Sequence, residues 1–563
     1  MTGTHTVAAS VATSPTPVTL NPLGVTVTID DAWSPYGQVV VECSQPPLSE
    51  LEAIDPRTPL RVNLTVSDGT VSRAMDLALR SRKIDHVSAK LTIEAATDEA
   101  LLQDDARVET TVDTSALTYQ ASLRALINNV VLAPIGAHLE TDAGADADLT
   151  IPSAATNVFV NPSAETNTTG WVTATSDAAL TRQTTVAKSG TASIRSQVQV
   201  ATANGVGIFS GTSTAPPFLI AVTAGVSYTF TIWVYTAIPN AVGKPSIRWG
   251  SSSAVIGAEA TAQFSVPVNT WTRVTVTGTA PAGATGAAPW VWVNGAGTLS
   301  TGQNAYFDAA RFSPTGADLD YFDGSTPATT LYTYAWTGTA HASTSTRTVL
   351  GVARDPAMFR WLPGETAWDF VHPLVEAGKL RLFCDTQRKW HLVDPAKYTV
   401  AGLIQVSAGQ NAIDATDTIS RDGEWFDSVV VAYKWVDTAG VSRAQWDIAG
   451  GPGTKTITVE KSTPWPGPGA AAALLQRSQK RGRVLSLGTV NDYRATPGMT
   501  LQAQLPGAPL QEGVISALTW ELPGDEMTIT SRGLMEINTG AWLYQPVGES
   551  WNAQPVGTSW DES

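Results

Sequence analysis

Two short segments place aromatic side chains where they could bind a sugar. In "TIWVYT", Trp233 and Tyr235 alternate with valine, and in "WVWVN", Trp290 and Trp292 do the same. Side chains of a strand alternate between its two faces, so each aromatic pair shares one face. Valine costs less to bury in the core than tryptophan or tyrosine. If the valines face the core, the aromatic pairs line an open sheet face that could bind a sugar. The alternative is that the aromatics fill the core, because large aromatics dominate β cores.

The residues that catalysis would need form no recognisable motif. The histidines are scattered, without zinc-ligand spacing: His5, His86, His138, His341, His372 and His391. The chain has no Gly-x-Ser-x-Gly nucleophile elbow and no phosphate-binding loop after a strand. Glu365 and Asp369 lie one helical turn apart and would suit glycoside hydrolysis, but acids on one helix face are usually only solvated. The sequence therefore predicts no enzyme.

The composition predicts that these residues are positioned mainly by β-strands. Of the 563 residues, 43% are hydrophobic and only 15% are charged. The abundance of Thr, Val, Gly and Pro favours β packing with many turns and a few short helices. The net charge of -15 repels phosphate, so any contact with DNA should be non-adhesive.

Targeting and redox features are few. Cys43 and Cys384 lie in apolar strand-like runs without metal-ligand or disulfide spacing, so buried free thiols are expected. The N-terminus lacks the pattern of a signal peptide, and no apolar run is long enough to span a membrane. We expect synthesis in the cytoplasm and a chain that stays soluble.

Composition shifts divide the chain into segments. The polar residues 1–17 predict a flexible N-terminal arm, and a small, acidic, proline-broken stretch marks a junction at 141–156. Residues 18–150 and 348–538 predict two β-rich pieces of one body. Residues 157–315 predict an inserted β-sandwich and 316–347 a linker that returns from it. Two independent domains in series would give a similar pattern.

Helices are expected at three places. "SLRALINNVVLAPIG" has apolar residues at helical spacing before Pro134 and Gly136. "PGETAWDFVHPLVEAGKL" predicts a helix capped by Gly364 or Thr366 and disturbed by Pro373. "AAAALLQRSQKRG" predicts a third helix, with a basic last turn that suits the helix dipole.

The C-terminal segment 539–563 is an internal repeat. "QPVGESWN" and "QPVGTSWD" recur every nine residues and place Trp542, Trp551 and Trp560 in register. So short a peptide cannot bury three indoles by itself. The repeat is expected either to dock on a partner or to wrap back over its own domain, because aromatics mark interfaces and cores alike.

Four stretches carry resemblances to known families. "YFDGSTPATTLYTYAWTGTAHASTSTR" (321–347) resembles a stretch of minor tail proteins from phages of actinobacteria, where it follows a carbohydrate-binding-like sandwich. "PGMTLQAQLPGAPLQEGVISALTWELPGDEMTITSRGL" is similar to the closing part of those proteins, which resemble the baseplate or tail-tip hub family of tailed bacteriophages. "NVFVNPSAETNTTGW" with "NAYFDAARF" is similar to carbohydrate-binding-module, or galactose-binding-like, sandwiches.

The hub resemblance implies a fold and partners. It implies barrel- or sandwich-type β domains interrupted by an inserted jelly-roll sandwich, in a homotrimer whose two similar β domains per chain approximate six-fold symmetry. The implied place is the distal end of the tail in the virion. The implied neighbours are a distal tail protein, the tape measure and tip or fibre proteins, with DNA in transit through the lumen.

The sandwich resemblance implies a structural calcium, although no cofactor is required. The matching ligands would be the carboxylates of Glu165 and Asp308 and backbone carbonyls near Ser189 and Gly190. Oxygen ligands from separated loops suit a hard cation. Ala164 departs from the family pattern, which has a bulky residue there.

Taken together, the sequence predicts a structural tail-tip hub whose inserted sandwich contacts host cell-wall glycan. The alternatives are a carbohydrate-binding adhesin, a peripheral receptor-binding protein of the virion and, less favoured, a glycoside hydrolase.

Overall fold

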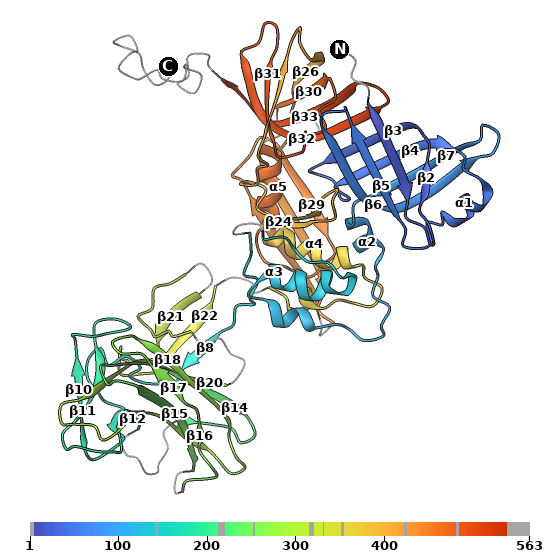
Figure 1. Ribbon diagram of the computed structural model, residues 1–563. Helices are drawn as coiled ribbons and strands as arrows, with labels where there is room; N and C mark the ends of the chain where they lie inside the picture. Colours follow the sequence, from blue (N-terminus) through green and yellow to red (C-terminus); the bar gives the residue numbers. More distant parts are fainter. Residues whose placement is uncertain are drawn as a thin grey trace, which may run out of the picture. The chain divides into compact units, whose positions relative to one another are not determined.

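The computed structural model describes residues 5–537, apart from 142–144, 212–219, 252–253, 315–319, 330–331, 351–353, 422–424, 438–439 and 480–482. The fold is mainly β with short helices, as the composition predicted (Figure 1). No described helix is both long enough and apolar enough to cross a membrane.

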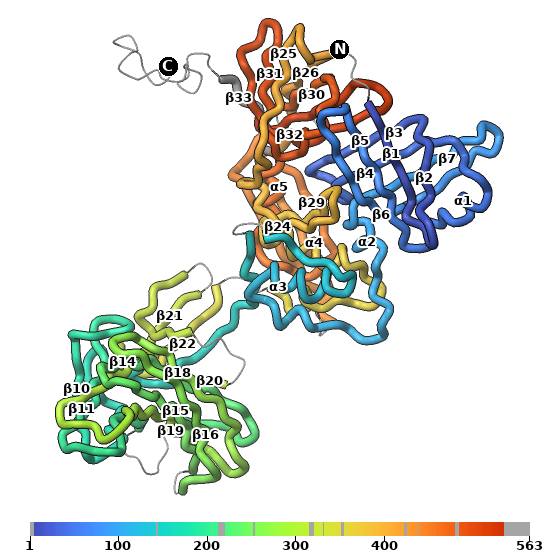
Figure 2. The backbone as a smooth tube through the Cα atoms, in the orientation of Figure 1, coloured from blue at the N-terminus to red at the C-terminus, as the bar shows by residue number. Residues whose placement is uncertain are grey.

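The chain forms two compact units. Unit 1 consists of residues 1–151 together with 354–563, and unit 2 consists of residues 152–353. Figure 2 shows the N-terminal and C-terminal strands of unit 1 side by side. Both ends of the chain therefore contribute to one body.

The N-terminal strands of unit 1 follow one another in the order β2-β1-β5-β6-β7-β4-β3. Their bounds are β1 (Thr6–Val11), β2 (Val18–Leu20), β3 (Pro22–Asp30), β4 (Gly37–Ser44), β5 (Arg61–Ser67), β6 (Ser72–Asp85) and β7 (Lys90–Ala96). Alternation buries one face of each strand, as in β4, where every second residue is buried.

The predicted N-terminal arm 1–17 is wrong for its described part. Residues 6–11 form β1, which pairs with β5 from Thr6↔Ser67 to Val11↔Val62. Ala9 and Val11 are buried in the core. The strand was missed because its polar residues lie on the opposite face and hide a short alternation.

The C-terminal strands of unit 1 extend the same sheet. Their bounds are β25 (Leu403–Ser407), β26 (Ala412–Ile419), β30 (Arg483–Thr489), β31 (Thr500–Gln504), β32 (Leu510–Leu522) and β33 (Glu526–Ile537). Antiparallel pairing of β3 with β32, from Val25↔Leu522 to Asp30↔Ala517, joins the two sets of strands. One hydrophobic core runs through both and includes Val27 and Trp520.

Three short helices contribute to a second core in unit 1: α2 (Glu99–Asp104), α3 (Leu123–Leu126) and α4 (Ala367–Ala377). The hairpin of β23 (Arg381–Cys384) and β24 (Trp390–Val393) belongs to the same core. Two more helices lie elsewhere in unit 1: Leu51 of α1 (Leu48–Ala53) is part of the large sheet core, and α5 (Ala470–Gln479) is part of a third, smaller core. After α3 the chain continues as a π-helix and a 3-10 turn that ends at Gly136 in the left-handed conformation.

The three predicted helices are confirmed in place, although the first is α-helical only over Leu123–Leu126. Thr366 caps α4 by accepting the N–H of Asp369, and the helix continues through Pro373. Cys43 and Cys384 are buried free thiols as predicted, and burial raises the pKa of Cys43 to about 11.

A three-stranded sheet packs against α5. It consists of β27 (Ser428–Val436), β28 (Ser442–Ala449) and β29 (Thr456–Lys461) in the order β28-β27-β29. Val429, Val431 and Tyr433 on one face of β27 form a small core with Ala471 of the helix.

Unit 2 contains two sheets around one core. The first has the order β10 (Ala178–Gln183), β11 (Ser193–Val198), β20 (Asn304–Pro314), β14 (Ser227–Thr236), β18 (Thr272–Thr279). The second contains β9 (Trp171–Thr173), β12 (Val206–Ser210), β13 (Ile220–Ala221), β15 (Ala241–Gly250), β16 (Ala260–Thr261), β17 (Phe264–Val266) and β19 (Gly286–Asn294). Core residues such as Phe230, Val234, Val291 and Phe307 come from both sheets, as in a β-sandwich.

Residues 316–347, assigned to a linker, contain folded structure within unit 2. Strands β21 (Tyr332–Trp336) and β22 (Ser345–Val349) form a hairpin, and β22 pairs with β8 (Ala155–Asn157). The Arg347 guanidinium lies 4.4 Å from the ring centre of Tyr332 and 5.5 Å from that of Phe322, which is buried. Aromatic and cationic side chains thus order a stretch that resembles a loop in composition.

Candidate glycan-binding face

Trp233 and Tyr235 lie on the outer face of the five-stranded sheet. Phe230, Ile232 and Val234 point into the sandwich core, so the alternate positions of β14 face outward. Both aromatics are half-buried. The aromatics therefore line an outer face of the sandwich, and valine fills its core.

A row of polar and aromatic side chains crosses this outer face. Thr181 pairs with Arg195, Arg195 with Tyr306, and Tyr306 with Tyr235 on successive strands. The Tyr235 ring lies 5.8 Å from the Tyr306 ring and 5.5 Å from the Trp271 ring. Neighbouring strands are about 4.8 Å apart, so the row from Thr181 to Tyr235 spans roughly 14 Å. This length suits an extended ligand that runs across the strands.

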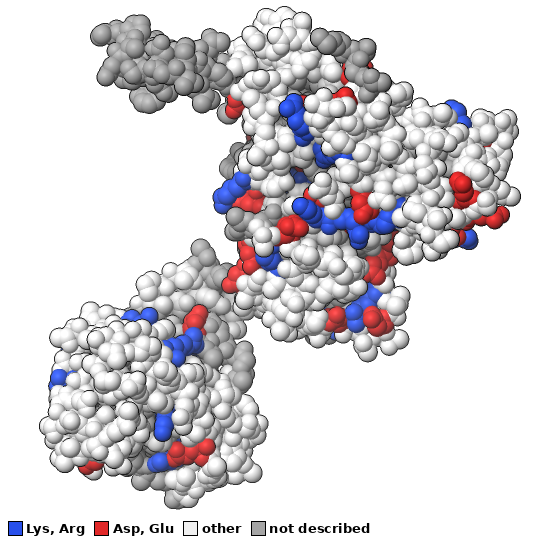
Figure 3. Space-filling model, in the orientation of Figure 1, with Lys and Arg blue, Asp and Glu red and all other residues white. Residues whose placement is uncertain are grey.

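A second line of contacts borders the row. The ammonium of Lys188 lies 4.0 Å from the centre of the Trp233 ring, within cation–π range. Trp233 pairs across the sheet with Arg273, which lies 3.5 Å from Asp320. Lys188 makes no ion pair with any residue that the structure describes. Charged side chains are sparse on the side of unit 2 visible in Figure 3.

Trp290 and Trp292 lie elsewhere. They belong to β19 of the second sheet, on the face opposite Val291, which is in the core. The two sheets enclose one core, so their outer faces point away from each other. The structure therefore does not bring the four predicted aromatics into one site.

The second outer face is more closed than the first. The Arg248 guanidinium lies 5.2 Å from the Phe209 ring and 5.7 Å from the Trp290 ring, and it forms an ion pair with Glu259. Phe209 is only 2% exposed. The indole N–H of Trp290 is buried and has no hydrogen-bond partner among the described residues.

Tyr306 and Trp271 were not singled out from the sequence. Tyr306 occurs in "NAYFDAARF", where it alternates with the core residues Ala305 and Phe307. That alternation was a usable signal. Trp271 directly precedes β18, and only the tertiary structure shows that it contacts Tyr235.

Asp308 organises the loop that carries Lys188. One carboxylate oxygen of Asp308 accepts the N–H groups of Lys188 (2.7 Å) and Ser189 (2.9 Å), and the other accepts that of Ala309 (2.6 Å). Burial raises the pKa of Asp308 to about 7, although these N–H groups act in the opposite direction, and the charge of Glu165 raises it further.

Glu165 holds the next residues of the loop. It accepts the N–H of Thr191 (3.0 Å), its hydroxyl (2.8 Å) and the N–H of Ala192 (3.2 Å). Gly190 has a φ of +64°, and a Cβ atom there would lie 2.3 Å from the Glu165 carboxylate. Gly190 is therefore required by both its backbone conformation and its close approach.

The implied calcium site fits this arrangement in part. Glu165 and Asp308 provide two carboxylates whose charges interact, which is the hard-oxygen chemistry calcium requires. The contact of Ser189 with Asp308 is made by the backbone N–H as donor, and not by the backbone carbonyl that the resemblance implied as a ligand. The described residues include no cluster of three or more His, Cys, Asp or Glu side chains able to hold a metal.

The carboxylate pair considered for hydrolysis has a different geometry from the one expected. Glu365 precedes the N-cap of α4, so it does not share a helical face with Asp369. Its carboxylate accepts the N–H of Leu362 at 3.0 Å. Burial raises the pKa of Glu365, and the charge of Asp369 adds to this effect. Both acids line a pocket of about 220 Å³ in unit 1.

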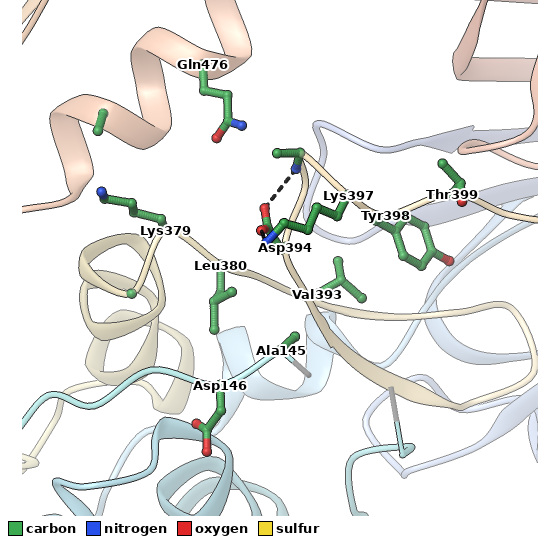
Figure 4. Close-up of a pocket in the computed structure, with 13 residues that line it drawn as sticks. Ala145, Asp146, Lys379, Leu380, Val393, Asp394, Lys397, Tyr398, Thr399 and Gln476 are labelled. Atoms are coloured by element: carbon green, nitrogen blue, oxygen red, sulfur yellow. Dashed lines mark hydrogen bonds and ion pairs between the residues drawn. The ribbon is translucent and has the colours of Figure 1, made fainter. Parts of the chain in front are cut away.

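A larger hollow of about 900 Å³ in unit 1 is lined by both polar and apolar side chains (Figure 4). Asp394 accepts the N–H of Ala396 and lies 3.2 Å from the Lys397 ammonium. Asp146 accepts the hydroxyl of Ser122 and lies on another segment of the wall. Both acids of this hollow therefore have hydrogen-bonding or ionic partners.

Trp542, Trp551 and Trp560, predicted to dock on a partner, lie outside the described residues.

Comparison with known proteins gives matches among solved structures alone. No protein-family model matches the chain, and no curated protein matches it. The chain is similar to a tail protein from Neisseria meningitidis, with 9% identity, 93% of this chain and 96% of that chain covered, and a TM-score of 0.38. A 43 kDa tail protein of prophage MuSo2 from Shewanella oneidensis aligns with 9% identity, 93% and 98% coverage and a TM-score of 0.38.

A third similarity covers about a third of the chain. The xylan-binding domain of Xyn10C from Paenibacillus barcinonensis aligns with 12% identity over 30% of this chain and 100% of that domain, with a TM-score of 0.22. TM-scores this low do not establish a common fold, and identities this low do not establish a common function.

Proposed function

We propose that the chain is a structural protein of a phage tail, and specifically the axial hub at the distal end. The observation that carries this proposal is the pairing of β3 with β32, which joins an N-terminal and a C-terminal set of strands into one body. The two sets of strands share one sheet and one core, and we propose that each set corresponds to one of the two β domains per chain that the sequence resemblance implies. Unit 2 is an insertion between residues 151 and 354 of this body.

A trimeric hub would use these features in a physically consistent way. Two sets of strands in each of three chains would offer six similar surfaces to a hexameric tail tube, and closed symmetry is the common form of such assemblies. The net charge of -15 would limit adhesion of DNA in transit. The neighbours in this proposal are the distal tail protein, the tape measure and tip or fibre proteins.

For unit 2 we propose binding of host cell-wall glycan on the outer face of the five-stranded sheet. Support comes from Tyr235, whose ring contacts those of both Tyr306 and Trp271, and from Arg195, the cross-strand neighbour of Tyr306. Aromatic rings with a few convergent polar groups are typical of sugar sites. We further propose a structural calcium held by Glu165 and Asp308, which would offset their mutual repulsion. No catalytic role is proposed for either unit.

The hub proposal is tested on virions and on the purified chain. We expect gold-labelled antibody against the chain to mark the distal tail end, and light scattering of the purified chain to give the mass of a trimer. Absence of label from both intact and disrupted particles would contradict the tail role and favour the adhesin alternative. Label at the tip without three-fold axial density would favour a peripheral receptor-binding protein.

A further inference from the structure

Two adjacent hollows of unit 1, of about 610 Å³ and 50 Å³, share Ala32, Trp33 and Arg477. We call the joint hollow the Trp33 cleft. Its walls come from the turn after β3, from β26, from α5 and from β33, and they include Trp33, Thr418, Leu474, Arg477, Thr530 and Arg532. No function described above uses this cleft.

Most charges in the cleft are already paired. Asp31, which is buried, lies 2.6 Å from Arg532. Glu376, also buried, lies 3.3 Å from the ammonium of Lys461. These two ion pairs neutralise the buried acids of the cleft.

Two arginines of the cleft are not paired in this way. Arg381 and Arg477 form no ion pair with any described residue. The Nη2 atom of Arg381 is buried without a hydrogen-bond partner, and its guanidinium lies 4.6 Å from the Phe383 ring. Burial lowers the pKa of Arg381, interactions with Asp31, Tyr36 and Glu99 oppose this effect, and the smaller influence of Arg477 adds to it. A carboxylate entering the cleft would supply the ionic partner that Arg477 lacks among the described residues.

The apolar part of the cleft is also incompletely covered. The Trp33 side chain is 48% exposed, although it lines both hollows. Leu474 of α5 adds a second apolar side chain to the lining. A half-exposed indole beside an unpaired guanidinium fits an occupant that combines an aromatic ring with a carboxylate.

The C-terminal repeat of this chain has that chemistry. Residues 538–563 contain three tryptophans and the acids Glu549, Asp561 and Glu562, and they contain no Lys or Arg. In the last repeat, Trp560 is followed directly by two acids. This segment is therefore complementary to the cleft in both charge and apolar character.

The cleft is within reach of the repeat. Arg532 of β33 lines the cleft, and β33 ends at Ile537, five residues later. An extended chain spans roughly 3.3 Å per residue, so residues 538–563 could reach about 85 Å from that point. Return to the cleft uses a small part of this length.

We propose that the C-terminal repeat of the same chain binds the Trp33 cleft, with the Trp560 indole against Trp33 and an adjacent carboxylate paired with Arg477. The proposal is independent of the tail role, because it concerns contacts within one chain.

The first test is competition in the full chain. A fluorescent peptide of residues 553–563 is titrated into the wild type and into the full chain carrying W542S, W551S and W560S. We expect at least tenfold weaker apparent binding to the wild type, because a tethered segment competes at a millimolar effective concentration. Equal binding to both chains, or binding to neither, would overturn the proposal.

Cleft variants locate the binding. In the full chain that carries W542S, W551S and W560S, the further substitutions W33A and R477Q should each weaken peptide binding at least tenfold, whereas R494Q should not. Arg494 is an exposed arginine paired with Asp492, away from the cleft lining. A peptide with D561N and E562Q should bind as weakly as the wild-type peptide binds R477Q. Unchanged affinity in W33A and R477Q would place the peptide elsewhere and contradict the proposal.

A cross-link distinguishes the same chain from a second copy. Thr418 is exposed and lines the cleft, so the full-chain variant T418C/S559C places thiols at the cleft and beside Trp560. Light and heavy isotope-labelled chains are mixed and then oxidised. Binding within one chain should give disulfide-linked peptide pairs in which both peptides are light or both are heavy. Mixed-isotope peptides would show that the repeat of a second copy occupies the cleft, which overturns the proposal as stated.

Discussion

The two outer faces of the inserted sandwich carry similar aromatic pairs, but they differ in whether the cationic side chain beside the rings is paired with an acid. On the five-stranded sheet, Asp308 binds the backbone N–H of Lys188, and the ammonium itself stays unpaired among the described residues. On the other sheet, Arg248 is neutralised directly by Glu259. The first face keeps a cation and aromatic rings available to a ligand, whereas the second uses them for its own packing.

This difference shows why aromatic alternation alone does not identify a binding face. Alternation treats Trp233 and Trp290 alike, and the structure places both on outer faces. What separates them is whether the cation beside the ring has an ionic partner among the described residues. Four predictions sharpen or break this comparison.

The largest expected effect is a pH dependence of unit 2 that arises from Asp308. The pKa is about 7 in the folded chain against 3.8 ordinarily, so between pH 4 and 7 the folded state holds a proton that the unfolded chain releases. Stability should therefore fall as pH rises through this window, by up to about 4 kcal/mol. Urea unfolding of wild type and D308N at pH 4.5 and 7.5 measures the effect.

Calcium provides the control for this prediction. Added calcium should recover part of the stability lost at pH 7.5 in the wild type but not in D308N. A stability difference between wild type and D308N that does not change with pH would show that Asp308 titrates normally. That result would contradict the predicted pH dependence of unit 2.

The second prediction concerns the anchoring of the two cations. D308A leaves the N–H groups of Lys188 and Ser189 without their acceptor and should lower the free energy of unfolding by about 2–3 kcal/mol. E259A removes a partly exposed ion pair and should cost about 1 kcal/mol or less. Equal losses in chemical denaturation would contradict the distinction between the two faces.

The third prediction concerns glycan binding. Y235A/Y306A removes the centre of the aromatic row and should reduce retention on cell-wall glycans at least tenfold, a difference of about 1.4 kcal/mol. W290A/W292A, the matched pair on the other sheet, should leave retention within about twofold, or roughly 0.4 kcal/mol. A glycan array probed with both variants measures this. The reverse pattern would assign binding to the second sheet.

The smallest expected effect follows from removing the cation of the first face. K188Q keeps the backbone contact with Asp308 but loses the cation–π contact with Trp233, which is worth about 0.5–1 kcal/mol. Chemical denaturation should show this loss, and K397Q, an exposed lysine of unit 1, should show less than about 0.5 kcal/mol. If K397Q lowers the free energy of unfolding more than K188Q does, the loss in K188Q is no greater than that from an ordinary exposed lysine, which contradicts the prediction.

Much of the local structure was predictable because it depends on short-range periodicity. Helical spacing and end signals located α3, α4 and α5, and apolar surroundings predicted the burial of Cys43 and Cys384. Short or polar strands were harder. β1 was taken for a flexible arm and the β21–β22 hairpin for a linker, because their partners, β5 and β8, lie far away in sequence.

The candidate site was predictable only in its individual residues. Alternation in "TIWVYT" identifies Trp233 and Tyr235 but not their neighbours. Tyr306 joins them through the pairing of β14 with β20, and Trp271 through the start of β18. Cross-strand neighbours depend on sheet order and register, which alternation within one strand does not contain.

The sequence by itself determined the β character of the chain, the alternation that puts valine on one face of a strand and tryptophan on the other, and the approximate places of three helices. These features follow from backbone periodicity and local hydrogen bonding. The tertiary structure alone decided that β3 meets β32, that the two aromatic pairs lie on opposite faces, and that Trp33, Arg477 and Arg532 line one cleft. The physical reason is that these contacts join residues distant in the chain, whose meeting depends on how whole sheets pack.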